Sequence, residues 1–250
     1  PQLLLLLGSG LTVVLIVIIV AALLIREHTS TLQAAKRSST NIAQLINADV
    51  LRNVELYDLA LKGLIAARQR EDLAKVDATI QHLVQFDLST AAPFKGEVLM
   101  LDASGAVIAD SSTLRPTPRN FADRDYFQVH LKDPQAGLYI SRAFQIRCDC
   151  DQVWRIAFSR RVSGPNGEFA GVAVATMRLA YFDQLFSTLT IGNGSSVNLL
   201  NTHGILLAQQ PLLESDMINK DLSERPNFKR MLREGNGSFQ ATSTITGKDR

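Results

Sequence analysis

The chain has 250 residues, of which 46% are hydrophobic and 20% charged, and its formal net charge is +2 at pH 7. With no acidic or basic tail, this balance gives no indication of nucleic acid as a partner. Cys148 and Cys150 are too few for a disulfide framework. We interpret them as free thiols at a hairpin tip; a bound metal and a strained or intermolecular disulfide are the alternatives.

Residues 3–25 are uncharged and dominated by Leu, Ile and Val. As an α-helix, this stretch spans roughly 35 Å, which is enough to cross a bilayer core. The pattern predicts a transmembrane helix within residues 1–25. A cleaved signal peptide is the alternative, but the run is too long for one and meets Arg26 without a small-residue cleavage site. The sequence begins at Pro1, directly against this run, so the flank whose Lys and Arg content would set the orientation is missing and the orientation is not readable from charge bias.

Residues 26–70 predict a long amphipathic helix that continues from the membrane. Its apolar residues recur at steps of three and four: Ile42, Ile46, Val50, Val54, Tyr57, Leu61 and Leu64. The first part, between Thr29 and Thr40, is too polar to be buried, so it stands as a stalk or pairs with a second copy. A further helix is predicted over residues 72–86, with one apolar side formed by Leu73, Val76, Ile80 and Leu83.

A strand-turn-strand pattern occurs twice, at residues 98–109 and 197–208, and its turn glycines, Gly105 and Gly204, are 99 positions apart (204 − 105). In both copies an apolar run meets Asp or Asn, then Gly, then a second apolar run, which is typical of a β-hairpin. We interpret the repeat as a duplicated domain. Coincidence between two ordinary hairpins is the alternative.

The first copy continues with a Pro- and Arg-rich loop over residues 114–120 and a short helix over 121–131. Antiparallel strands are then predicted at residues 138–144, 153–162 and 169–179, with turns at the Cys-Asp-Cys-Asp segment and at residues 163–167. With the first hairpin they make a five-stranded sheet, and a helix over 181–189 leads to the second copy.

The second copy repeats this plan with a hairpin at Gly204, a helical excursion between residues 212 and 233, and a strand at 238–245. Only 13 residues follow Gly237 (250 − 237), whereas about 40 follow the equivalent Gly137 before the first sheet is complete. We therefore predict an α+β fold of two tandem domains, the second incomplete, in a chain that is a fragment.

An anchor, a long helix and two tandem five-stranded domains resemble the double Cache, PAS-like sensor modules of bacterial membrane receptors, over residues 26–250. Within that family, the chain is most similar to the distal domain of membrane-bound diguanylate cyclases. The motifs that carry this likeness are Asp-Arg-Asp-Tyr-Phe at 123–127, Tyr-Ile-Ser-Arg at 139–142, Phe-Ser-Arg-Arg at 158–161, Gly-Glu-Phe-Ala-Gly-Val at 167–172 and Tyr-Phe at 181–182. Histidine kinases and chemoreceptors carry related modules.

The resemblance implies a ligand sensor of the bacterial inner membrane, with the residues after 25 in the periplasm. It places a second membrane helix and a cytoplasmic GGDEF output domain beyond Arg250, and it implies a homodimer. The predicted parts are a transmembrane helix (1–25), a stalk helix (26–70), a membrane-distal Cache domain (71–189) and an incomplete membrane-proximal one (190–250). A histidine kinase or chemoreceptor output is the alternative.

Arginines cluster in the first copy, in a stretch where Lys132 is the only lysine: Arg115, Arg119, Arg124, Arg142, Arg147, Arg155, Arg160 and Arg161. Guanidinium groups hold carboxylates or phosphates by two hydrogen bonds, which suits capture of a small anion. A solvated or acid-paired surface is the alternative for any one of them. We hypothesise that Arg124, Tyr126 and Arg142 line a pocket in the distal domain.

In amino-acid-binding double Cache receptors, which the chain resembles, an Arg-x-Trp-Tyr element grips the ligand carboxylate, and a later Tyr and a strand Asp hold the ammonium. Arg124 to Phe127 match the first element, whereas Phe144 and Thr176 replace the Tyr and the Asp. A buried ammonium would lack an anionic partner, so a carboxylate without an amine fits better. The candidate ligand-binding residues are Arg124, Asp125, Tyr126, Ser141, Arg142, Phe144, Trp154 and Thr176.

Strand alternation puts Trp154 and Arg155 on opposite faces of their strand, without saying which face meets a pocket. Trp154 is therefore either a core residue or a ligand platform. No catalytic constellation, phosphate-binding loop or HExxH motif is recognisable, so we predict no catalytic residue, metal or cofactor in this segment. The rival functions are a membrane-anchored hydrolase and an adhesion module whose pocket would be filled by side chains.

Overall fold

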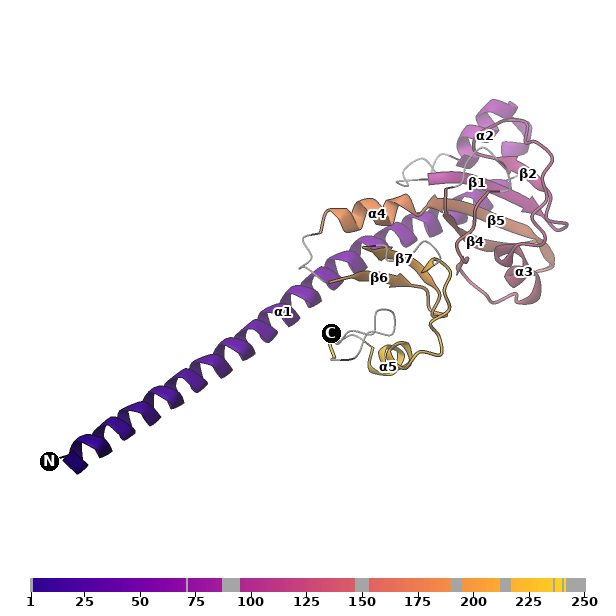
Figure 1. The fold of residues 1–250 in the computed structure, drawn as a ribbon. Helices are drawn as coiled ribbons and strands as arrows, with labels where there is room; N and C mark the ends of the chain where they lie inside the picture. Colours follow the sequence, from indigo (N-terminus) through magenta and orange to yellow (C-terminus); the bar gives the residue numbers. More distant parts are fainter. Residues whose placement is uncertain are drawn as a thin grey trace.

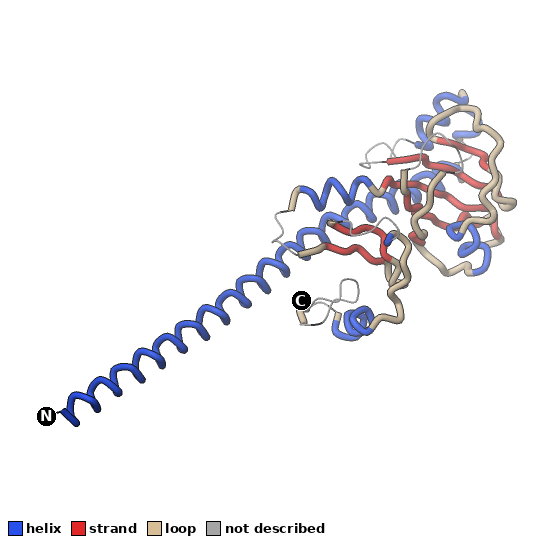
Figure 2. The backbone as a smooth tube through the Cα atoms, in the orientation of Figure 1, coloured by secondary structure: helices blue, strands red, loops and turns tan. Residues whose placement is uncertain are grey.

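The structure is a computed structural model that describes residues 2–70, 72–86, 95–146, 153–189, 195–211, 217–235, 237–239 and 241. It combines long and short helices with a five-stranded antiparallel sheet and a two-stranded hairpin, which confirms the predicted mixed α and antiparallel β class. Figures 1 and 2 show the larger sheet gathered around the C-terminal end of one long helix.

That helix, α1 (Gln2–Arg68), runs unbroken from the apolar N-terminal stretch into the amphipathic segment, as predicted. Its N-terminal half extends away from the rest of the molecule (Figure 1). The apolar side chains from Val14 to Ile25 are exposed. Among the described residues, α1 is the helix long and apolar enough to cross a membrane. The polar part between Thr29 and Thr40 is also exposed.

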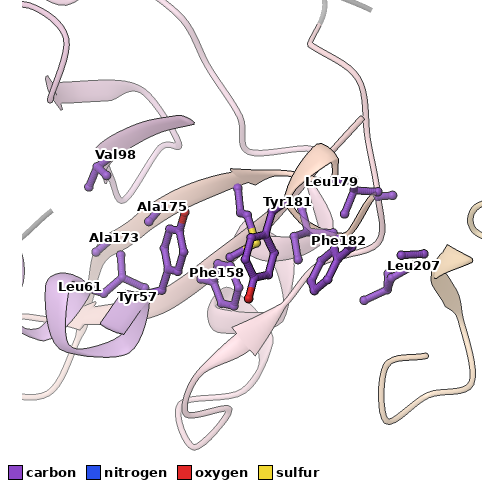
Figure 3. Close-up of a cluster of buried hydrophobic side chains, with 14 of the residues drawn as sticks. Tyr57, Leu61, Val98, Phe158, Ala173, Ala175, Leu179, Tyr181, Phe182 and Leu207 are labelled. Carbon is purple, nitrogen blue, oxygen red and sulfur yellow. The ribbon is translucent and has the colours of Figure 1, made fainter. Parts of the chain in front are cut away.

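The C-terminal half of α1 packs against the sheet through the predicted apolar stripe. Tyr57, Leu61 and Leu64 are buried there. The Tyr57 ring stacks on Phe158 with centroids 4.5 Å apart (Figure 3). Ile46, Val50 and Val54 continue the contact as partly buried side chains. The 3.6-residue periodicity thus identified the buried face of α1 correctly.

The larger sheet has the strand order β2-β1-β5-β4-β3, and all its pairings are antiparallel. The strands are β1 (Lys95–Asp102), β2 (Val107–Asp110), β3 (Tyr139–Ile140), β4 (Arg155–Ser163) and β5 (Phe169–Arg178). The predicted strand over 138–144 is wrong in length. After Ile140 the segment meets β4 only through Ser141 and a bridge at Phe144, while both backbone groups of Ala143 bond the Asn219 side chain.

The two faces of this sheet bury different clusters. Even-numbered residues of β1 and β4 and odd-numbered residues of β5 meet α1. The opposite set packs under α3 (Asp125–Lys132), with Tyr126 and Phe127 at its centre. Side chains that alternate along each strand therefore separate an α1 face from an α3 face.

The helix predicted over residues 72–86 is interrupted, and its predicted apolar side is wrong. A short 3-10 helix (Leu73–Lys75) is followed by Val76 in extended conformation and then by α2 (Ala78–Phe86). Because Val76 breaks the helical period, Leu73 and Phe86 are buried, whereas Val76, Ile80 and Leu83 are exposed.

The second hairpin consists of β6 (Val197–Leu200) and β7 (Leu206–Gln210), joined to the first unit by α4 (Ala180–Ser187) and followed by α5 (Pro226–Glu234). Leu207 of β7 joins the same buried cluster as Phe182 of α4 (Figure 3). Cys148, Cys150, most of the predicted strand over 238–245 and the start of the excursion at 212–216 lie outside the described residues.

The two hairpins agree in detail. Gly105 and Gly204 have φ values of 84° and 80°, and the pairing register slips at Met100/Leu101 in one hairpin and at Leu199/Leu200 in the other. Asp102 and Asn201, one at the head of each turn, accept backbone N–H bonds from the second and fourth residues that follow. The predicted hairpins are confirmed.

Candidate functional site

A cavity of about 230 Å³ lies on the α3 face of the larger sheet. Its walls come from β1, β4 and β5, from the loop before α3, from the start of α3 and from the segment after β3. The lining residues are Glu97, Leu99, Arg119, Asn120, Phe121, Arg124, Tyr126, Phe144, Ile146, Arg155 and Thr176.

Three neighbouring strands supply the floor of the cavity. Leu99, Thr176 and Arg155 come from β1, β5 and β4 and belong to the α3 face. Gly96 gives the two polar side chains room, because a Cβ there would lie 2.2 Å from Thr176 Oγ1 and 2.8 Å from Arg155 Nη1. The missing side chain of a β1 residue thus lets Arg155 and Thr176 lie against the strand.

Arg119 is a structural arginine at the rim. Its Nη1 donates to Glu97 Oε1 at 2.8 Å and its Nη2 to Asp110 Oδ2 at 2.6 Å. Asp110 is buried, with a side chain 3% exposed, so the bonded guanidinium compensates its charge. Both Glu97 and Arg119 are therefore engaged with protein partners rather than left for a ligand.

Arg124 is different. It is the N-cap residue of α3, and its guanidinium carbon lies 5.1 Å from the centroid of the Phe144 ring. Its buried Nε has no hydrogen-bond acceptor, which is also true of the Arg119 Nε. Within the described part of the chain, no carboxylate forms an ion pair with it. A buried donor without an acceptor costs free energy, so this guanidinium is suited to an anion brought in from outside.

Aromatic and aliphatic side chains form the rest of the wall. Tyr126 is buried and its ring lies 5.9 Å from that of Phe144. Burial raises the pKa of the Tyr126 phenol well above its ordinary value, so the group stays protonated and neutral. Leu99, Phe121 and Ile146 add an apolar surface. The cavity can therefore hold a small anion with an apolar body.

Four predicted site residues line this cavity: Arg124, Tyr126, Phe144 and Thr176. The other four do not, and their contacts explain why. Asp125 turns away from the cavity, because its Oδ2 accepts hydrogen bonds from the Tyr139 hydroxyl and the Arg142 backbone N–H. Ser141 is fully buried, and its Oγ accepts the Ala157 N–H.

Arg142 and Trp154 also lie outside the lining of this cavity. Arg142 is exposed, at the sheet edge. Trp154 packs with the cluster on the α1 face, because residues 154, 156 and 158 share that side of β4. The core alternative for Trp154 is correct, and Arg155 takes the cavity face instead.

Sequence reasoning missed Glu97, Leu99, Asn120, Phe121 and Ile146, and it noted Arg119 and Arg155 only as members of the arginine cluster. Strand alternation places Arg155 and Trp154 on opposite faces of β4. Knowing that Trp154 lies on the α1 face would therefore have placed Arg155 on the cavity face. Nothing local distinguishes Glu97, whose place in the site depends on the return of the chain at Arg119.

The described residues thus form an α+β domain with a long helix on one face of an antiparallel sheet and an arginine-lined cavity on the other. The sequence matches the Cache domain family dCache_1 over residues 21–250, and the chain therefore belongs to this family. No protein with a curated description matches. The chain is thus a Cache sensor domain, of the kind found in the extracellular parts of signalling receptors.

Solved structures support the fold. The extracellular domain of rpHK1S-Z16, assigned as a histidine kinase, is 25% identical with a TM-score of 0.68, over 85% of this chain and 86% of that one. The periplasmic sensory domain of the Campylobacter jejuni chemoreceptor Tlp1 is 12% identical, with a TM-score of 0.59 over 84% of each chain. The ligand-binding domain of the Pseudomonas aeruginosa PAO1 amino acid chemoreceptor PctC, in complex with GABA, is 18% identical, with a TM-score of 0.52 over 76% of this chain and 81% of that one.

Proposed function

We propose that this chain is the periplasmic ligand-sensing region of a receptor in a bacterial inner membrane, and that the cavity beside Arg124 is its sensor site. The observation that carries the proposal is the Arg124 guanidinium, which lies in the cavity wall with a buried Nε and no carboxylate partner among the described residues. The exposed apolar end of α1 supports membrane anchoring.

The ligand we propose is a small carboxylate without an amine. GABA is bound to PctC, and isoleucine to the sensory domain of the Campylobacter jejuni chemoreceptor Tlp3. An ammonium of that kind needs a carboxylate in the site. In this cavity, Glu97 is the acidic residue of the described wall, and its carboxylate already accepts a hydrogen bond from Arg119. Phe144 and Thr176 offer no negative charge.

The proposal is tested by calorimetric titration of the full chain in nanodiscs with matched pairs that differ only in the α-amine: propionate and alanine, and valerate and norvaline. The carboxylates are expected to bind and their amine counterparts to bind at least tenfold more weakly. Replacing Arg124 with Met removes charge-assisted hydrogen bonds and should weaken binding about 10- to 150-fold.

Arg142→Ala is the matched control, since Arg142 is an exposed arginine next to the site but not in its wall. The affinity of the Arg142→Ala variant for the carboxylates should equal that of the unchanged chain. Absence of binding by every carboxylate of the series, tighter binding of the amines, or equal affinity of Arg124→Met would each overturn the proposal.

For the signal, we propose a population shift transmitted through β4. Arg155 of this strand lies in the cavity wall, and Arg160 on its other face forms an ion pair with Asp58 of α1, which Lys62 also contacts at 2.8 Å. A ligand that prefers one position of β4 would bias α1, which is continuous with the apolar N-terminal segment.

We further propose that the output is a diguanylate cyclase with a GGDEF domain. The support is the set of motifs at residues 123–127, 139–142 and 158–161, and a histidine kinase or chemoreceptor output is the alternative. The reading frame beyond residue 250 decides between them: a GGDEF signature, a helix with a phospho-accepting His, or a long coiled coil.

Two tandem Cache domains, 71–189 and an incomplete 190–250, and a homodimer complete the proposal. The matched hairpins support the duplication. The exposed segment between Thr29 and Thr40 is the pairing surface. Single cysteines placed there, in a chain with Cys148 and Cys150 replaced, should cross-link; absence of cross-links would argue against the dimer.

A further inference from the structure

Asn219 lies in the turn between β7 and α5 with a φ of 70°, and it is the one non-glycine residue with positive φ in the described part of the chain. Asn tolerates this left-handed conformation better than other side chains, but glycine adopts it at lower cost. Asn at such a position therefore suggests that the contacts of its side chain offset the cost of the backbone conformation.

The side chain of Asn219 makes two hydrogen bonds to one residue of the sheet edge. Its Oδ1 accepts the Ala143 backbone N–H at 2.8 Å, and its Nδ2 donates to the Ala143 carbonyl at 2.7 Å. Ala143 is 5% exposed, so these bonds replace the water that would otherwise satisfy a sheet edge. The amide pairs with Ala143 as a neighbouring strand would.

The next residue, Phe144, belongs to the cavity wall. Its backbone N–H and carbonyl bond the Arg155 carbonyl and N–H at 2.8 and 2.9 Å, and its ring lies over the Arg124 guanidinium. Ala143 faces Asn219 and Phe144 faces β4, because backbone groups alternate along an extended segment. The segment that carries Phe144 is thus held from both edges.

Asn219 is fixed at its other end to the second hairpin. Its backbone N–H donates to the Leu206 carbonyl at 2.8 Å, and the Leu206 N–H donates to the Lys220 carbonyl at 3.0 Å. Leu206 is the first residue of β7 and is fully buried. Asn219 therefore links Leu206 of β7 directly to Ala143, the residue before Phe144 of the cavity wall.

We propose that Asn219 is a positioning residue that couples the Phe144 side of the cavity to the β6–β7 hairpin. A change in the cavity that moves the Phe144 segment must strain or break the two Asn219 bonds, and by linkage a change at the hairpin acts on the cavity to the same extent. Its part in sensing rests on the proposed function, whereas the coupling itself is measurable without ligand.

The test is hydrogen exchange of the full chain in nanodiscs, measured by mass spectrometry with single-residue fragmentation. Asn219→Gly removes the side chain and relieves the backbone, so the chain should still fold. We expect about tenfold faster exchange of the Phe144 and Arg155 amides, which bond each other and not Asn219. Asn219→Asp, the isosteric variant, keeps the acceptor for the Ala143 N–H but places a carboxylate oxygen against the Ala143 carbonyl, so it should also accelerate exchange of these amides.

The reverse direction uses Phe144→Ala, which removes the cavity wall. It should accelerate exchange of the Asn219 and Leu206 amides, whereas Ile108→Ala, a truncation on the outer strand β2, should not. The double variant Asn219→Gly with Phe144→Ala should be non-additive. Unchanged Phe144 and Arg155 amides in Asn219→Gly, or additive effects, would overturn the coupling. Failed carboxylate titrations would instead overturn the ligand proposal and leave this result unaffected.

Discussion

Replacing Arg124 with Met should stabilise the ligand-free protein, although it removes the residue to which we assign ligand binding. The substitution deletes a buried Nε–H that has no acceptor, which is worth roughly 1–3 kcal/mol. It also loses the cation–π contact with Phe144, worth about 0.5–2 kcal/mol, but a Met sulfur over the same ring recovers about 0.3–1.5 kcal/mol.

The balance is a gain of about 1 kcal/mol, which corresponds to a rise in melting temperature of about 2–4 °C for a chain of this size. The backbone contribution is unchanged, because the Arg124 side chain makes no capping hydrogen bond to α3. A site shaped for its ligand rather than for its own stability behaves in this way.

The assay is thermal unfolding of the full chain in nanodiscs, followed by circular dichroism without any added carboxylate. Arg115→Met is the matched control: Arg115 is an exposed arginine of the loop before α3, and we expect its replacement to change the melting temperature by less than about 1 °C. A melting temperature of Arg124→Met below that of the control would refute the reasoning, because Arg124 would then have a compensated charge in the free protein.

Three further predictions concern the fold. Leu61→Ala should cost about 2–5 kcal/mol in the free energy of unfolding, whereas Leu59→Ala on the exposed side of α1 should cost less than about 1 kcal/mol. Gly171→Ala should prevent folding, judged by solubility and circular dichroism, because φ is 140° and the new Cβ would lie 2.0 Å from the Leu101 carbonyl oxygen; Gly137→Ala, with open space around it, should cost only about 1–2 kcal/mol. Burial alone would raise the pKa of Asp58, but hydrogen bonds from Arg160 and Lys62 outweigh it and hold the pKa below its usual range. The stability that this carboxylate contributes is therefore present above its ordinary pKa near 4 and is lost as the pH falls through the lower folded value, so the difference in stability between the unchanged chain and Arg160→Met should shrink on acidification below about pH 4; a constant difference would contradict the assignment.

The parts of the fold that periodicity controls were predictable from the sequence. The stripe from Ile42 to Leu64 lies on the buried face of α1, and the Gly105 and Gly204 turns form the expected hairpins, because each pattern is local and is repeated several times. The pattern failed where a single residue changed the period. Val76 in extended conformation rotates α2 relative to Leu73, and the local signal for the new helix start is Asp77, whose Oδ1 accepts the Thr79 backbone N–H at 2.8 Å.

The cavity was harder to predict, because its walls are set by strand order and by the return of distant segments. Arg124 and Tyr126 of the motif at 123–127 line the cavity, whereas Asp125 of the same motif and Arg142 of the arginine cluster do not. In the structure the Asp125 carboxylate bonds the Arg142 backbone, which ties α3 to the sheet edge outside the cavity. Arg155 reaches the site from the other side through β4, whose register was not derivable from its own residues.

The comparison of the two copies explains why we assign sensing to the first. Beyond the turns, the match continues: Phe121 and Leu222 bond the carbonyls of Gly105 and Gly204 at 2.9 Å, and Arg124 and Arg225 are the N-cap residues of α3 and α5 with nearly the same backbone angles. Arg225 is exposed, however, whereas Arg124 is packed against Phe144 over a five-stranded sheet. The two copies therefore share the helix start that presents an arginine, and what distinguishes Arg124 among the described residues is the surface of Phe144, β4 and β5 beside which it lies.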